Sequence, residues 1–402
     1  MVGADNTGIC GFLWVTCSRL VPCNSSTNAC DQPATICVRH PRCHDLPICY
    51  PASMLDQRTC PPITSWTNAS SMINIRHYHT ASVLTNGKVL VTGGFAGNPG
   101  SYLSTAELYD PSTGRWTTTA SMKYQRWRHV ASVLTNGKVL VIGGDNTRYL
   151  NNTELYDPST ETWTTTGSMK YERYGHTASV LTNGKVLVSA GHNQNISLNS
   201  VELYNPLTGT WATTNNMTDA RFDHTASVLT NGKVLITGGN NGRGSALSSA
   251  ELYDLSTGLW TTTGSMNYVR YQHTASVLTN GKVLVTAGYG RGVLKSAELY
   301  DPSTGLWTTT GDMNNARADH TASVLINGKV LVTGGTNYDG DLNSAELYDP
   351  STAIWTITNS MNDIRKRHTA SVLTNGKVLV IGGSKNDTVL KSTELYSLFQ
   401  RN

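Results

Sequence analysis

The sequence predicts an all-β protein: a seven-bladed β-propeller with four-stranded antiparallel blades, preceded by a small cysteine-rich module. Three observations predict this architecture. The phrase RHYHTASVLTNGKVLVTGG, residues 76–94, returns six more times with little change. Its second histidine recurs at spacings of 47 to 50 residues, a period typical of propeller blades or repeat arrays. All eight cysteines lie within the first 60 residues.

Each repeat contains four candidate strands. HTASVLT is followed by an Asn-Gly turn, a strong hairpin signal because both central residues of a type I′ turn need positive φ. KVLVTGG is a continuous apolar run, as expected for a strand buried on both faces. SAELYDPSTGLW supplies a third strand, a turn and the tryptophan that opens a fourth, WTTTGSM. Four antiparallel strands make one blade.

The two ends of the repeat region complete one another. The last repeat stops at STELYSL and lacks a tryptophan strand, whereas ITSWTNASSM stands alone before the first repeat. We therefore expect a strand around residues 63–72 to become the outer strand of the blade built from residues 365–398. This closure joins the first and last blades and defines a propeller domain over residues 63–398.

The cysteine-rich module occupies residues 1–60. An even number of closely spaced cysteines, in a segment too short to build its own core, predicts disulfides formed in an oxidising compartment. A zinc site is the alternative, but there is no C-x-x-C pair and His40 and His44 are the only histidines nearby. The pairing stays open. The cysteines are Cys10, Cys17, Cys23, Cys30, Cys37, Cys43, Cys49 and Cys60.

We expect an extracellular, secreted location. Six N-x-S/T sequons agree with secretion. The first residues do not form a convincing signal peptide, because Asp5 stands where positive charge belongs, so we expect a piece of a longer secreted or membrane-anchored protein. No apolar run is long enough to predict a membrane span, and a net charge of +4 indicates no nucleic-acid partner. The sequons begin at Asn24, Asn68, Asn151, Asn195, Asn216 and Asn386.

A Gly-Gly pair, then a Tyr-Asp-Pro strand end, then a tryptophan: this recurring pattern resembles kelch repeats. The resemblance covers about residues 63–398. It implies a β-propeller whose usual role is to bind other molecules.

The two faces of the predicted propeller differ in variability. The first-to-second strand turn reads TNG six times and ING once, at Ile326. The loops between second and third strands differ throughout, and variation on a rigid scaffold is where recognition is normally found. We therefore expect binding on the loop-rich face. The loops read FAGNPGSYLS, DNTRYLNN, HNQNISLN, NNGRGSALSS, YGRGVLKS, TNYDGDLNS and SKNDTVLKS.

A variable pair lies inside each R-x-x-H motif, at the start of the inner strand. Repeats one to five each offer an aromatic residue there, and repeats seven, one and two add basic residues, which suits a protein hot spot or a sugar with an anionic group. Trp127 is the first candidate, with packing between blades as the alternative. The pairs are His77-Tyr78, Trp127-Arg128, Tyr174-Gly175, Phe222-Asp223, Tyr271-Gln272, Ala318-Asp319 and Lys366-Arg367. From them we predict ligand-binding roles for His77, Tyr78, Trp127, Arg128, Tyr174, Phe222, Asp223, Tyr271, Lys366 and Arg367.

The arginines of R-x-x-H allow two interpretations. A ring of seven arginines could bind an anion, as the kelch resemblance implies for proteins that bind acidic peptides, and on this basis Arg76, Arg126 and Arg365 join the predicted binding residues. Each repeat also supplies one glutamate, so seven Arg–Glu pairs could neutralise the ring instead. The seven repeat histidines are interpreted as structural, each satisfying a buried backbone group.

No catalytic residue, metal site or cofactor is predicted. RHYHTASVL resembles the strand of galactose oxidase and related copper-radical oxidases that carries a Tyr-His ligand pair, here Tyr78 and His79. That resemblance also requires a cysteine cross-linked to a tyrosine, and no cysteine follows Cys60. The leading hypothesis is an extracellular module that binds a protein or glycan. A copper-radical or carbohydrate-active enzyme and an intracellular kelch adaptor remain alternatives.

Overall fold

The computed structural model describes residues 35–38, 48–51, 64–97 and 101–398. The chain divides into two compact units, one comprising Trp66–Tyr396 and the other Met1–Ser65 with Ser397–Asn402. The described part of the second unit contains an antiparallel hairpin of β1 (Thr35–Val38) and β2 (Ile48–Pro51). Cys49 is buried and disulfide-bonded. The rest of the predicted cysteine module lies outside the described residues and side chains, so it stays a prediction.

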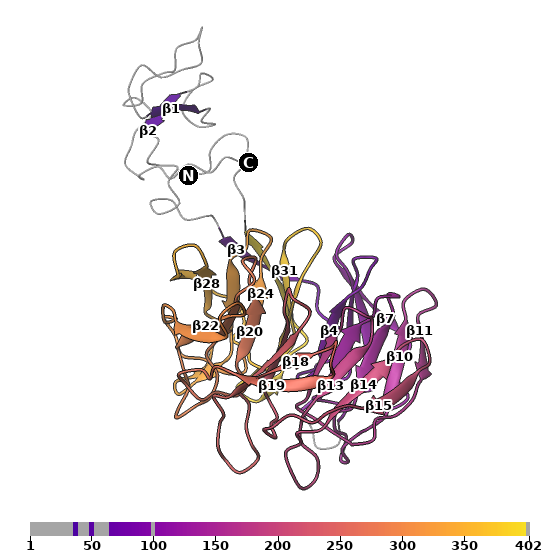
Figure 1. Ribbon diagram of the computed structural model, residues 1–402. Helices are drawn as coiled ribbons and strands as arrows, with labels where there is room; N and C mark the ends of the chain where they lie inside the picture. Colours follow the sequence, from indigo (N-terminus) through magenta and orange to yellow (C-terminus); the bar gives the residue numbers. More distant parts are fainter. Residues whose placement is uncertain (1–34, 39–47, 52–63, 98–100, 399–402) are drawn as a thin grey trace. The chain divides into compact units, whose positions relative to one another are not determined.

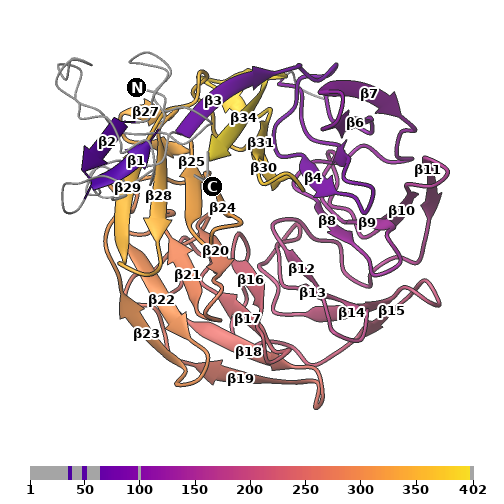
Figure 2. The ribbon, with the colours of Figure 1, turned by 90° about the horizontal axis from the view of Figure 1, so that it is seen from above.

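The propeller consists of seven four-stranded antiparallel sheets around a central axis (Figures 1 and 2), here numbered blades 1 to 7 along the chain. The inner strands are β4 (Thr80–Val83), β8 (Val130–Val133), β12 (Thr177–Val180), β16 (Thr225–Val228), β20 (Thr274–Val277), β24 (Thr321–Val324) and β30 (Thr369–Val372). The second strands are β5 (Val89–Thr92), β9 (Val139–Ile142), β13 (Val186–Ser189), β17 (Val234–Thr237), β21 (Val283–Thr286), β25 (Val330–Thr333) and β31 (Val378–Ile381).

The outer half of each blade follows the same order. The third strands are β6 (Ala106–Asp110), β10 (Thr153–Asp157), β14 (Val201–Asn205), β18 (Ala250–Asp254), β22 (Ala297–Asp301), β28 (Ala345–Asp349) and β34 (Thr393–Leu398). The outer strands are β7 (Arg115–Thr119), β11 (Thr162–Thr165), β15 (Thr210–Thr213), β19 (Leu259–Thr263), β23 (Leu306–Thr309), β29 (Ile354–Thr358) and β3 (Thr64–Ala69). Two loops add small hairpins, β26 (Thr336–Asn337) with β27 (Gly340–Asp341) and β32 (Ser384–Lys385) with β33 (Thr388–Val389).

The predicted closure of the ring is confirmed. β3 lies beside β34 and completes blade 7, with the strand order β3-β34-β31-β30. Trp66 Nε1 donates to the backbone carbonyl of Asn359 at 2.7 Å, and Thr393 Oγ1 donates to that of Ser70 at 2.6 Å. Each inner strand contacts the inner strands of both neighbouring blades, including β30 with β4. All seven blades therefore have two neighbours.

The core lies between blades. The second strands are buried along their whole length, as their apolar sequence predicts. The rings of the repeat tyrosine and tryptophan of each blade contact each other at a tilted angle, as in Tyr109 and Trp116 with ring centroids 5.2 Å apart. The tryptophan also donates Nε1 to the segment after the preceding blade's outer strand, as Trp163 does to the Ala120 carbonyl at 2.8 Å. These residues are structural, as their regularity indicates.

The described part of the chain contains no helix with the length and apolar character that crossing a membrane requires.

The conserved Asn-Gly turns form one end of the propeller, here called the turn face. Gly137 adopts φ +81°, and a Cβ there would come within 3.4 Å of Thr85 Oγ1 in the turn of blade 1. At Gly376 the neighbour is Ile326, whose Cδ1 would lie 2.9 Å from an added Cβ. The left-handed backbone therefore constrains the turn glycine, and the neighbouring turn lies in contact with it. The opposite end, the loop face, carries the second-to-third strand loops and the connections between blades.

Candidate functional site

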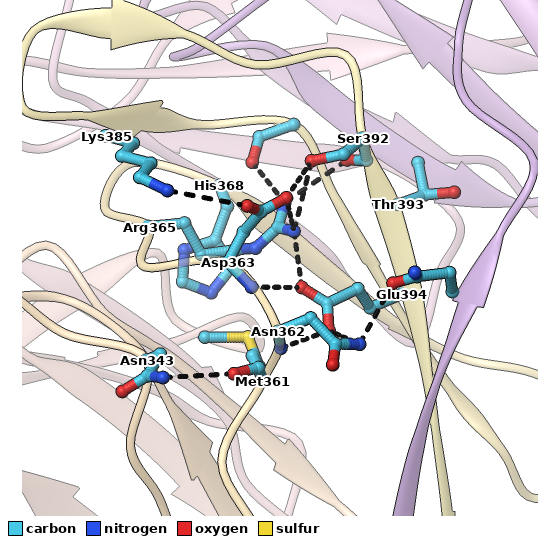
Figure 3. Close-up of polar contacts among 12 residues, drawn as sticks. Asn343, Met361, Asn362, Asp363, Arg365, His368, Lys385, Ser392, Thr393 and Glu394 are labelled. Atoms are coloured by element: carbon cyan, nitrogen blue, oxygen red, sulfur yellow. Dashed lines mark hydrogen bonds and ion pairs between the residues drawn. The ribbon is translucent and has the colours of Figure 1, made fainter.

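The seven arginines of R-x-x-H are fully buried and paired within their blades. In blade 7, Arg365 Nη2 lies 2.7 Å from Glu394 Oε1, and Arg365 Nη1 donates to the Gly382 carbonyl at 2.8 Å (Figure 3). Glu394 also accepts the backbone N–H groups of Asn362 and Asp363. The other six pairs, at 2.7 to 3.0 Å, are Arg76–Glu107, Arg126–Glu154, Arg173–Glu202, Arg221–Glu251, Arg270–Glu298 and Arg317–Glu346.

This arrangement decides between the two interpretations of the arginine ring. A buried guanidinium needs a carboxylate and hydrogen-bond acceptors, and each blade supplies both. Arg76, Arg126 and Arg365, predicted to bind ligand, are each 0% exposed, so the structure does not offer them to a ligand. We correct that assignment and call the seven Arg–Glu pairs clamps, because each glutamate fixes the backbone of the connection that enters its blade.

The repeat histidines link neighbouring blades through side-chain hydroxyls rather than through backbone groups. His129 Nε2 lies 3.0 Å from Thr80 Oγ1 of blade 1, and His79 Nε2 lies 3.0 Å from Thr369 Oγ1 of blade 7. His176 is the exception because Val130 replaces the threonine. Burial lowers the pKa of His176, and the nearby backbone of Ile142 opposes this shift only in part. Neither ring nitrogen of His176 has a hydrogen-bond partner in the described part of the chain. The structural interpretation of the histidines holds with a different partner.

The second variable residues of R-x-x-H encircle the axis at the loop face and are here called the mouth ring. All seven have φ between 49° and 59°. Five donate their N–H to the equivalent carbonyl of the preceding blade, as Arg128 does to Tyr78 at 3.1 Å. Left-handed backbone is uncommon for most of these residue types, so the ring is held by the surrounding scaffold. Its members are Tyr78, Arg128, Gly175, Asp223, Gln272, Asp319 and Arg367.

The first variable residues build the predicted aromatic arc. Trp127 contacts the rings of Tyr78 at 5.3 Å and Phe95 at 5.6 Å, measured between centroids. Its Nε1 has no hydrogen-bond partner in the described part of the chain. Further round, the contacts are Tyr149–Tyr174 at 5.2 Å, His192–Phe222 at 5.2 Å and Tyr271–Tyr289 at 5.4 Å. The arc thus spans blades 1 to 5.

Sequence reasoning missed half of this arc. The residue after each Gly-Gly or Ala-Gly pair forms a β-bridge with the first variable residue, which brings in Phe95, His192 and Tyr289. Tyr102 and Tyr149 come from the second-to-third strand loops. A signal was present, because the position after the glycine pair varies between repeats as strongly as the R-x-x-H pair does.

The basic arc predicted at blades 7, 1 and 2 is largely neutralised, which is a second correction. Lys366 Nζ lies 3.0 Å from Asp341 Oδ1, and Arg367 Nε lies 3.0 Å from Asp319 Oδ2. Burial, reinforced by the charges of Arg367, Arg128 and Lys366, lowers the pKa of His77 to about 4, so this ring is neutral at pH 7. Of the three residues of this arc that stay charged, Lys366 and Arg367 are paired, and Arg128 forms no ion pair with a described residue.

The described residues contain no group of three or more His, Cys, Asp or Glu side chains that could hold a metal ion. The Tyr78 and His79 side chains, which resemble an oxidase ligand pair, form hydrogen bonds with other side chains. Tyr78 accepts a hydrogen bond from Arg128 Nη2 at 3.0 Å, and His79 bonds Thr369.

Comparison with known proteins agrees with a kelch-type propeller. The Attractin/LZTR1 beta-propeller family matches residues 63–297, and the KLHDC2/KLHL20/DRC7 Kelch-repeats domain matches residues 223–401. The first match covers more than half of the chain, so this chain belongs to the Attractin/LZTR1 beta-propeller family. The kelch resemblance is confirmed.

Two solved structures share the fold at low identity. A novel fungal alcohol oxidase of the AA5 family, in complex with copper, is 18% identical, with a TM-score of 0.69 over 84% of this chain and 76% of the oxidase. YjhT is 16% identical, with a TM-score of 0.57 over 72% of this chain and 99% of YjhT. Such likeness shows the fold alone. No curated protein sequence matches the chain.

Proposed function

We propose that the chain is an extracellular binding module that takes a protein ligand at the loop face, over the mouth ring and the aromatic arc. One observation carries this proposal. Seven equivalent positions on a rigid ring bear seven different residue pairs, and five of the pairs contain an aromatic residue. A residue that served only the closure of the ring would repeat, as the clamps do.

The surface chemistry of the loop face supports a protein ligand. Aromatic residues supply large contact area at low entropic cost and are enriched at binding hot spots. Beyond the arc, Ile196 is 60% exposed and Tyr338 is 79% exposed, both on second-to-third strand loops. These side chains add apolar contact area to the proposed docking surface. Kelch propellers typically bind proteins, which agrees with the family assignment.

An extracellular location is supported by composition. Eight cysteines in 60 residues fit an oxidising compartment. Two of the sequon asparagines, Asn195 and Asn386, are exposed on loops of the loop face. An intracellular adaptor would contain reduced thiols. Mass measurement before and after thiol alkylation without reductant tests this point, with no alkylated cysteine expected.

A glycan is the second candidate ligand, favoured by the pair Tyr149 and Tyr174. Their rings are nearly parallel, at 16°, and half-buried at the loop face. Aromatic faces of this kind stack against sugar rings. The copper-oxidase alternative has no specific support from the described residues.

The test is a binding screen of the full chain against arrays of secreted proteins and glycans. Trp127→Ala is expected to weaken capture about thirtyfold or more, the size of a hot-spot loss of about 2 kcal/mol. The double variant Arg128→Ala with Arg367→Ala is expected to weaken it as well. Ile326→Thr on the turn face is the control and should bind as wild type. Unchanged capture by both loop-face variants, with unfolding midpoints intact, would remove the site assignment.

A further inference from the structure

The mouth ring contains two opposite charges without ion-pair partners. Arg367 is neutralised by Asp319, its neighbour in the ring. Arg128 and Asp223 form no direct ion pair with any described residue. They belong to blades 2 and 4, and blade 3 between them contributes Gly175.

Arg128 is held by aromatic groups rather than by a carboxylate. Its guanidinium carbon lies 4.5 Å from the centroid of Tyr78, 5.1 Å from Trp127 and 5.5 Å from Tyr174. Nη2 donates to Tyr78 Oη at 3.0 Å, and Nε has no hydrogen-bond partner in the described part of the chain. Cation–π contacts fix the position of a guanidinium and leave its N–H groups able to bind an anion.

Asp223 is held from the other side. Gln272 Nε2 donates to Asp223 Oδ2 at 3.1 Å, while Oδ1 lies toward Gly175 and forms no hydrogen bond with a described residue. Burial raises the pKa of Asp223 although Arg128 acts in the opposite direction. A cation placed beside this carboxylate would relieve the cost of its burial.

Gly175 keeps space between the two charges. It is the one member of the mouth ring without a side chain. A Cβ added there would come within 2.8 Å of Asp223 Oδ1. Arg128 donates to Tyr78 in blade 1 and Asp223 accepts from Gln272 in blade 5, so the side-chain hydrogen bond of each charge goes to the neighbour on its far side from Gly175.

We propose that the mouth recognises a polypeptide segment that carries an acidic and a basic group close together, the acidic group at Arg128 and the basic group at Asp223. This inference rests on the proposed function and sharpens it. A ring of free arginines would select acidic peptides. The clamp arginines are instead neutralised by glutamates, and the mouth ring keeps one unpaired cation, Arg128, and one unpaired anion, Asp223. These two charges would select a segment of mixed charge.

The experiment selects a phage-displayed library of random short peptides on the full chain. The enriched peptides are expected to combine acidic with basic residues. For one enriched peptide, Arg128→Gln and Asp223→Asn should each raise Kd about tenfold to a hundredfold, the loss of a charged hydrogen bond. Both variants suit the backbone, because Gln272 occupies an equivalent ring position at φ 49° and asparagine tolerates left-handed φ.

Pairing is checked by changing the peptide as well. Replacing the acidic residue of the peptide by its amide should weaken binding to wild type but not to Arg128→Gln. Replacing the basic residue of the peptide by a neutral one should weaken binding to wild type but not to Asp223→Asn. Enrichment of purely acidic peptides, with Asp223→Asn binding as wild type, overturns this inference and leaves the proposed function standing. If wild type retains no peptide better than Trp127→Ala does, the proposed function falls too.

Discussion

The clamps and the mouth ring are neighbours in sequence and opposites in character. Arg76 is fully buried against Glu107, and two residues later Tyr78 is half-buried at the loop face against Arg128 and Arg367. The clamp is identical in all seven blades, whereas the mouth ring contains five residue types. Repetition therefore marks what the propeller needs at every blade, and variation marks what it needs only once.

The difference arises because clamp side chains bind the backbone, whereas mouth-ring side chains contact one another. Glu107 accepts the N–H groups of Ile73 and Asn74, in the connection that enters blade 1, so the clamp fixes one blade to the next. Loss of any one clamp would leave buried polar groups unpaired. The side chains of the mouth ring contact one another, as Tyr78 contacts Arg128 and Arg367. The hydrogen bonds between their backbones do not depend on residue type. The clamp position is constrained by the fold, and, under the function proposed above, the mouth position is constrained by the ligand.

The largest expected effect comes from acid, which acts on the repeated elements all at once. Burial lowers the pKa of His176 and of His320 to about 3, and lowers it well below 6.5 in the other five repeat histidines. The unfolded chain therefore binds more protons below about pH 6.5, and stability falls as pH falls. At about pH 5 the loss is about 2 kcal/mol for each such histidine, together enough to unfold a typical domain.

The measurement is the free energy of unfolding in urea, followed by tryptophan fluorescence, from pH 7.5 down to pH 5. Added salt should leave the trend intact, since burial rather than surface charge causes it. A free energy of unfolding that is the same at both ends of the range would contradict the neutral, buried state of the histidines.

Breaking one clamp is expected to have the next largest effect. Arg317→Met leaves Glu346 buried, and the expected loss is about 3–5 kcal/mol because an uncompensated buried charge remains. Burial tends to raise the pKa of Glu346, but hydrogen bonds from Asn314 and the charge of Arg317 hold it below the ordinary value. Urea unfolding measures the change.

The control is an ion pair of similar length at the surface. Lys329 lies 3.0 Å from Asp349, with side chains 22% and 27% exposed, and Lys329→Met should cost about 0–1 kcal/mol. Adding Glu346→Gln to Arg317→Met should recover part of the loss. Equal losses for Arg317→Met and Lys329→Met would show that the clamps do not hold the blades.

The fold was predictable because its determinants are local and occur seven times. The Asn-Gly turn, the apolar second strand and the repeat tryptophan each identify their own strand, and the unpaired ITSWTNASSM segment indicates the closure. The clamp was foreseen as one of two alternatives, since arginine and glutamate both recur in every repeat. Seven copies of one pattern make an internal alignment.

The state of charge at the mouth was not predictable in the same way. Asp341, which neutralises Lys366, comes from the loop of another blade and has no counterpart at a fixed spacing in the other repeats. Contacts between unique residues of different blades require the closed ring before they can be identified.

The smallest expected effect restores a repeated contact where the sequence lacks it. Six inner strands begin with a threonine whose hydroxyl bonds the histidine of the next blade. Blade 2 has Val130 at this position and leaves His176 without a hydroxyl partner. Val130→Thr is nearly isosteric and supplies that hydroxyl, so a gain of about 0.5–1.5 kcal/mol is expected in urea unfolding.

Blade 7 provides a matched control for this substitution. His79 has Thr369 as its hydroxyl partner at 3.0 Å, and Ile381 stands where Ile142 stands in blade 2. Thr369→Val should therefore lose about what Val130→Thr gains, and the double variant should match wild type because the two junctions share no residues. A loss at blade 7 without a gain at blade 2 would mean that His176 is already satisfied, and that this junction has departed from the repeat without a cost in stability.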